Sequence, residues 1–183
     1  MKNIFNLIII SLLIACNNDD DSVISNPEII ESSSPWITTA LYKQKNGEID
    51  RSINYINDTS ISNGTISSAQ YKDGKFIFVP VDPNTGDFTS PMTAETHTSN
   101  FGNYELYTID GTLTRRLFNT NFGYTNERKV TQLDSSKFTY LFTPSNDSVM
   151  YYVEHEPYHT VFPNKTYPDS LNTLVNERFN SFE

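Results

Sequence analysis

The residues best suited to chemistry lie together in the segment VEHEPYH, residues 153–159. A histidine beside carboxylates, here His155 with Glu154 and Glu156, can act as a general acid or base or bind a metal ion. Neighbouring residues on a strand point to opposite faces, however, which would separate the imidazole from both carboxylates. The alternative is that His155 closes the inner face of a strand beside Val153, while the glutamates are solvated.

The rest of the chain adds little to a catalytic hypothesis. It contains no Ser-His-Asp order, no Gly-rich phosphate loop and no Cys/His cluster. A metal site usually needs three or four converging ligands, and only His97, His155 and His159 are available as imidazoles. We therefore expect no metal, no cofactor and no enzymatic activity.

Aromatic side chains could build a different kind of site, since the chain has 11 Tyr and 12 Phe. Some of these rings either fill a core or line a small apolar cavity: Phe76, Tyr104, Tyr107, Tyr140 and Tyr151. Tyrosine also suits stacking against sugars. We expect a site for a small apolar or sugar ligand, or for an envelope protein, with these candidate residues: Trp36, Tyr140, Tyr151, Glu154, His155 and Tyr158.

The single cysteine, Cys16, follows a short apolar segment. Residues 1–15 contain Lys2 near the start and then an apolar run, which is typical of a secretion signal and too short to span a bilayer. The run ends in Leu13-Ile14-Ala15-Cys16, which resembles the lipobox of bacterial lipoproteins. In that motif the signal peptidase recognises the three residues before the cysteine, whose thiol accepts diacylglycerol. An ordinary secretory signal or a membrane anchor with a chance cysteine is the alternative.

The lipobox resemblance implies that the mature protein begins at acylated Cys16 and is anchored in the bacterial cell envelope. Several acyl chains on one residue make a stable anchor, whereas one chain binds only marginally. Asn17 is not the aspartate associated with inner-membrane retention, and the aspartates at 19–21 resemble a short export signal. The alternative is a solvated linker. We expect the protein in the outer membrane or at the cell surface.

The net negative charge argues against nucleic acid and against an anionic membrane surface as binding partners. Without residues 1–15 the chain keeps 12 basic and 22 acidic residues, so 12 minus 22 gives a net charge of −10. Nucleic-acid binding depends on basic clusters, and anionic headgroups would repel such a chain. The acyl chains must therefore provide the membrane attachment.

From Pro35 onward, apolar and polar residues alternate with a period of two, which predicts strands. Trp36, Thr38, Ala40 and Tyr42 would share one face. Turn dipeptides such as Asn46-Gly47, Asp73-Gly74 and Asp110-Gly111 separate the strands. Seven to nine antiparallel strands favour a small up-and-down β-barrel, lipocalin-like with about eight strands, and a small sandwich is the alternative.

Four segments are expected along the chain: a signal peptide at 1–15, a flexible tether at 16–34, the barrel at 35–167 and a helix at 168–183. In the last segment apolar residues recur at three- and four-residue steps, which predicts an amphipathic helix packed on the barrel. Its polar face lacks the Lys and Arg that are typical of a helix at a membrane surface.

Several motifs, in this order, resemble the bacterial lipoprotein family catalogued as domain of unknown function 4822: SPWITTALY at 34–42, AQYKDGKFIFVPVDPNTGDF at 69–88, SKFTY at 136–140 and YYVEHEPY at 151–158. The resemblance covers about residues 34–162 and implies no particular activity. The segment FNTNFGYTNER at 118–128 departs from the family pattern, which predicts a loop particular to this protein.

The leading hypothesis is a non-catalytic, lipid-anchored envelope protein whose barrel binds a small ligand or a protein partner. One alternative is an envelope enzyme that uses Glu154, His155 and Glu156 as an acid/base or metal site. Another is a structural or assembly scaffold, in which the barrel is packed solid and an exposed edge or residues 119–128 contact another envelope protein.

Overall fold

A closed antiparallel β-barrel forms the body of the protein. The computed structural model describes residues 26–58, 66–87, 101–120, 123–143 and 148–166, together with Thr173, Asn176, Glu177 and Asn180. In the described residues one sheet contains these strands: β1 (Trp36–Lys45), β2 (Glu48–Asp50), β3 (Ile66–Lys72), β4 (Lys75–Val81), β5 (Phe101–Ile109), β6 (Thr112–Asn119), β7 (Tyr124–Leu133), β8 (Phe138–Phe142) and β9 (Met150–Pro157).

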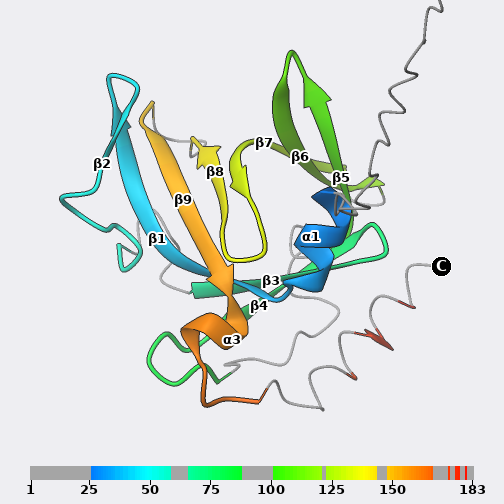
Figure 1. Ribbon diagram of the computed structural model, residues 1–183. Helices are drawn as coiled ribbons and strands as arrows, with labels where there is room; N and C mark the ends of the chain where they lie inside the picture. Colours follow the sequence, from blue (N-terminus) through cyan, green and yellow to red (C-terminus); the bar gives the residue numbers. More distant parts are fainter. Residues whose placement is uncertain are drawn as a thin grey trace, which may run out of the picture.

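Pairing of the first and last strands closes the barrel. The strand order is β2-β1-β3-β4-β5-β6-β7-β8-β9, and β1 also pairs with β9. Eight strands therefore form the closed wall, and β2 is the one strand outside it (Figure 1). All the pairings are antiparallel and most join neighbours in sequence, which confirms the predicted up-and-down barrel.

Tight turns of the predicted kind connect three strand pairs. Asn46-Gly47, Asp73-Gly74 and Asp110-Gly111 all have positive φ angles at both positions. This conformation is characteristic of type I′ turns, whose twist matches that of the strands they join. The hairpins β1–β2, β3–β4 and β5–β6 are thus fixed by local sequence.

A bulge in β1 changes which side chains face the interior. Thr38 pairs with His155, but Ala40 pairs with Glu154, and the register shifts between Thr38 and Ala40. Leu41 then pairs with inward-facing Val153. The expected common face of Trp36, Thr38, Ala40 and Tyr42 is therefore wrong, because the extra residue turns the later positions outward.

The core lies mainly inside the barrel. Buried residues from α1 and from seven of the strands form its largest cluster: Ile30, Trp36, Ala69, Tyr71, Phe76, Tyr104, Leu117, Val130 and Phe138. A second group of Leu41, Tyr151 and Val153 continues along the β1–β9 wall.

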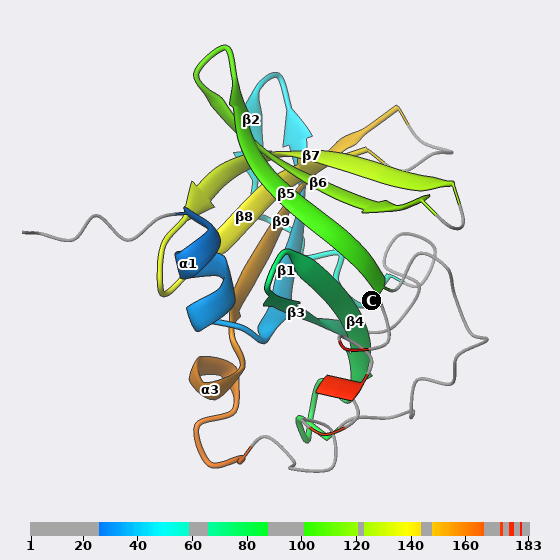
Figure 2. The same cartoon turned by 90° about the vertical axis from the view of Figure 1, so that its right-hand side faces the viewer.

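A short helix, α1 (Asn26–Ser32), lies across one end of the barrel and contacts both β3 and β7 (Figure 2). Ile30 is fully buried in the main core cluster, and the Trp36 indole Nε1 donates a 2.8 Å hydrogen bond to the Ile30 carbonyl. The flexible tether expected over 16–34 therefore ends sooner, since residues 26–32 are helical and packed. The part of that expected tether that precedes α1 lies outside the described residues.

The C-terminal part continues from β9 into α3 (Tyr158–Val161). Of the helix expected over 168–183, the described residues Thr173, Asn176, Glu177 and Asn180 are helical and exposed, and the remainder lies outside the described residues. Lys72 Nζ on β3 donates a 3.3 Å hydrogen bond to Asn176 Oδ1. The loop expected at 118–128 belongs largely to the adjoining ends of β6 and β7.

Candidate binding site

The centre of the barrel holds a buried arginine, Arg115 on β6, whose cross-strand neighbours are Leu106 and Arg128. Its guanidinium reaches across the interior, where Nη1 donates a 2.7 Å hydrogen bond to the Tyr71 hydroxyl on β3. The group also lies 4.4 Å from the centre of the Tyr140 ring on β8. The Nε–H group is buried and has no hydrogen-bond partner among the described residues.

Arg115 keeps its positive charge in this environment. Burial acts to lower the pKa of Arg115, but the adjacent Tyr71 and Tyr140 phenol groups raise it, so that it lies above its ordinary value. Across the described part of the chain, no carboxylate forms an ion pair with this guanidinium. Burying a charge without an opposite charge is costly, and a phenol hydrogen bond and cation–π contacts recover only part of that cost.

His155 on β9 faces the same interior, as the alternation of its strand predicts. Its Nδ1 lies 3.2 Å from the Phe138 carbonyl oxygen, and since a carbonyl only accepts, Nδ1 carries the proton. The imidazole stacks on Tyr140 with ring centres 5.0 Å apart. Burial, and secondarily the positive charge of Arg115, lower the pKa of His155 to about 3. The imidazole is therefore neutral at physiological pH.

The predicted aromatic residues Trp36, Tyr140 and Tyr151 also face inward. Trp36 packs edge-on against Phe138, with ring centres 5.8 Å apart, and Tyr140 lies 5.6 Å from the same ring. Tyr151 belongs to the second buried group, where its ring meets Tyr55 edge-on at 6.2 Å. The structure thus places Trp36 and Tyr140 near the centre and Tyr151 further along the wall.

Glu154 faces the outside of the barrel, where two cations hold it. Lys137 Nζ lies 3.3 Å from one carboxylate oxygen, and Arg51, in the segment after β2, pairs with the other. The Glu154 side chain is only 7% exposed, so the expectation of a solvated glutamate is wrong at this position. The Arg51 guanidinium also covers the outward rings of Tyr42 and Tyr152. The barrel wall separates this network from His155.

Tyr158 likewise lies outside the barrel, in a small cluster with Ile37 and Val81. Its hydroxyl donates a 2.9 Å hydrogen bond to the Gly86 carbonyl in the loop after β4. Gly86 has a positive φ, and a Cβ there would approach the Phe162 ring to 2.7 Å. Tyr158 therefore fixes α3 to that loop and is not part of the interior group.

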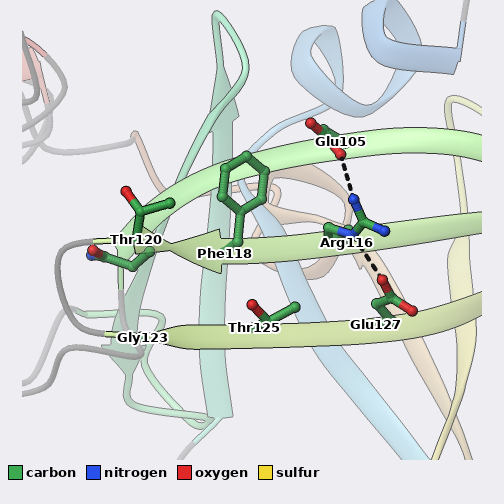
Figure 3. A pocket seen from close by; sticks show the side chains of 8 residues that line it. Glu105, Arg116, Phe118, Thr120, Gly123, Thr125 and Glu127 are labelled. Carbon is green, nitrogen blue, oxygen red and sulfur yellow. Dashed lines mark hydrogen bonds and ion pairs between the residues drawn. The ribbon is translucent and has the colours of Figure 1, made fainter.

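A shallow pocket is present on the outer face of β5, β6 and β7 (Figure 3). Arg116 bridges two strands there, with Nη1 3.2 Å from Glu105 and Nε 2.7 Å from Glu127. Tyr107, expected to line the interior, lies on this outer face, 4.9 Å from the Arg116 guanidinium. These side chains are partly exposed and already paired with one another, so the pocket resembles an ordinary solvated sheet face.

Two residues of the central group, Arg115 and Tyr71, were not predicted as site residues. The signal for Arg115 is present in TLTRRLFN, where Leu113 and Leu117 flank it at two-residue steps and place it on the apolar face. Adjacent Arg116 then faces outward. Two adjacent arginines conceal this pattern, because arginine is usually exposed and the sequence alone does not suggest that either of them is buried.

Comparison with known proteins leaves the family open. No protein-family model matches the sequence, and no curated protein matches it. The resemblance to the domain of unknown function 4822 family therefore stays a prediction.

Within the described ranges, no three His, Cys, Asp or Glu residues lie close enough to hold a metal ion, and His97 is outside those ranges. None of the described helices is long and apolar enough to cross a membrane.

Proposed function

We propose that this protein is a lipid-anchored lipoprotein of the bacterial envelope whose β-barrel binds a small ligand in its interior without converting it. The lipobox-like residues 13–16 support the anchor. The closed eight-stranded wall supports the binding role, since barrels of this size either fill with side chains or hold one small ligand.

One observation favours a ligand over a core that serves stability alone. Arg115 places an unpaired positive charge at the centre of the barrel, with its Nε–H unbonded among the described residues. Replacing buried ionic groups by apolar side chains of similar volume is often neutral or stabilising. A group that lowers the stability of the empty protein is typical of a functional site.

The geometry gives less support to an enzyme built on Glu154, His155 and Glu156. His155 faces the interior, whereas Glu154 faces outward and is occupied by Arg51 and Lys137. The three side chains therefore do not converge on one reacting atom, as a general acid–base site requires.

The test compares two adjacent arginines that face opposite sides of the wall. Wild type, Arg115→Met and Arg116→Met would be purified gently from envelope membranes, and their native and denaturing mass spectra compared. We expect wild type and Arg116→Met to retain a small molecule that is released on denaturation. We expect Arg115→Met to lose it, because the interior cation is gone.

Folding of each variant would be checked by circular dichroism. A wild-type protein with no retained molecule would contradict the proposal and favour a scaffold role. Equal retention by Arg115→Met and Arg116→Met would also contradict it, because the molecule would then be bound outside the barrel centre.

A further inference from the structure

The inner face of the barrel wall carries basic side chains and no carboxylate of the eight barrel strands, whereas the outer face carries charges of both signs. The cross-strand registers place every carboxylate of the eight barrel strands on the outer face: Glu105, Glu127, Glu154 and Glu156. The same registers turn four basic residues inward: Lys43, Arg115, Arg128 and His155. In a chain with a net charge of −9, the ionisable groups on the inward face of these strands, histidine included, are thus basic apart from tyrosine hydroxyls.

Two of these basic residues, both arginines, stand side by side. Arg115 and Arg128 are direct cross-strand partners on β6 and β7. Like charges in such positions are destabilising, and more so where water is excluded. Arg128 lies 4.5 Å from the centre of the Phe142 ring, and its Nη1 donates a 3.1 Å hydrogen bond to the Glu127 carbonyl. Arg115 has no carboxylate partner among the described residues, so an anion bound beside it would relieve the repulsion.

The surroundings of Arg115 restrict the kind of anion. Apolar side chains of the main core cluster enclose it, including Leu106, Leu117 and Phe138, whose ring centre is 5.5 Å from the guanidinium. A doubly charged, strongly hydrated anion would lose its hydration shell for few hydrogen bonds. A carboxylate carries one charge, and its two oxygens match the planar fork of a guanidinium.

We infer that the ligand is a small carboxylate with an apolar body, and that Arg115 binds its carboxylate group. This inference rests on the proposed interior-binding function. The Tyr71 hydroxyl, which accepts a 2.7 Å hydrogen bond from Arg115 Nη1, lies beside the guanidinium that would bind the carboxylate. Neutral His155, which contacts the rings of Phe138 and Tyr140, would belong to the aromatic surroundings of the apolar body.

The experiment uses matched probes that differ only in charge. Octanoate and octanamide form an alkyl pair, and naphthalene-2-carboxylate and its amide form an aromatic pair. Each would be titrated calorimetrically at pH 7 into the full chain in a non-ionic detergent, with blank titrations into detergent alone. Trp36 is the only tryptophan and lies in the same core cluster, so its fluorescence gives a second signal from the interior.

We expect at least one acid to bind wild type roughly 10-fold or more tightly than its amide, as a charge-assisted hydrogen bond implies. Arg116→Met should keep this preference, and Arg115→Met should lose it. The pair that shows the preference, alkyl or aromatic, identifies the ligand body.

Equal binding of acid and amide inside the wild-type barrel would overturn the carboxylate inference and leave the proposed binding function standing. Failure of all four probes to bind would also overturn the carboxylate inference. The proposed binding function would then be tested separately, by whether the native mass spectrum of the wild type shows a retained small molecule. If Arg115→Met does not fold, the acid–amide ratio of the wild type still tests the inference.

Discussion

At the scale of single residues, His155 has a measurable consequence for stability. Its pKa is lowered to about 3 in the folded protein, against about 6.5 in an unfolded chain. Between these values the unfolded state binds a proton that the folded state does not bind. The contribution of His155 to folding is therefore complete above pH 6.5 and is lost progressively as pH falls towards 3.

We predict that His155→Asn, which can still donate to the Phe138 carbonyl, removes this pH dependence. Relative to the variant, wild type should lose on the order of 1 kcal/mol of unfolding free energy per pH unit below about pH 6. Urea denaturation of both proteins from pH 4 to 8 would measure the difference. Parallel curves would mean that the imidazole is not held neutral by the barrel interior.

A second residue-scale prediction tests whether outward-facing Glu154 on β9 contributes to stability but not to ligand binding. Glu154→Gln removes the carboxylate that Arg51 and Lys137 share, and we expect the unfolding free energy to fall by about 1–3 kcal/mol. Retention of the interior ligand should not change, since Glu154 faces outward. Glu156→Gln, on the same outer face, is the matched control for a charge change alone. Loss of ligand in a folded Glu154→Gln protein would instead support an active role for the glutamate.

Sequence alone predicts part of this residue-scale detail. Alternation along β9 is sufficient to separate His155 from Glu154. It does not show that Arg51 returns to cover the glutamate, because that contact depends on the path of the segment after β2. The burial of Arg115 follows from strand parity only once the register of β6 is known.

At the scale of elements, the attachment of α1 to the barrel is the feature closest to the site. The Tyr104 hydroxyl on β5 donates a hydrogen bond to the Glu31 carboxylate of α1, which also accepts from the Gly74 amide at 3.2 Å. Burial and the hydrogen bond to Glu31 raise the pKa of Tyr104. The Ser34 hydroxyl accepts from the Tyr71 amide, so the residues that follow α1 are fixed beside the site.

We predict that Tyr104→Phe and Glu31→Gln each weaken this attachment. In a double-mutant cycle the two changes should show a coupling energy of about 1–2 kcal/mol, because the bond involves a charged acceptor. Amide hydrogen exchange over α1 should quicken more than exchange over β8 and β9. Additive effects of the two substitutions would indicate that the hydrogen bond does not hold α1 to the barrel.

Element-scale features differ in how well the sequence predicts them. The Asn-Gly and Asp-Gly turns require positive φ angles, so the hairpins can be placed without knowledge of the fold. The bulge between Thr38 and Ala40 and the helix over residues 26–32 cannot be predicted in this way. Both depend on distant partners: the bulge on the pairing of β1 with β9, and α1 on the open end of the barrel.

At the scale of the whole molecule, the net charge of the protein bears on how it is attached to a membrane. The chain carries a net charge of −9, and the barrel strands present their carboxylates outward. Such a surface is repelled by anionic headgroups, so electrostatic attraction cannot hold the protein at a membrane. Residues 17–25 separate Cys16 from α1, a stretch that can span at most roughly 35 Å. An acyl anchor at Cys16 would therefore keep the α1 end of the barrel close to the membrane.

We predict that Cys16 alone determines this attachment. Wild type should incorporate radiolabelled palmitate in a bacterial host and stay in the membrane fraction through washes with high salt and with carbonate. Cys16→Ser should incorporate none, because a hydroxyl does not replace the thiol as the acyl acceptor. Conversion of Ser22 to Ala, a nearby change that leaves the cysteine intact, serves as the control. Salt release of the wild type would mean that protein contacts hold it at the membrane, and would direct attention to an envelope partner rather than to a lipid anchor.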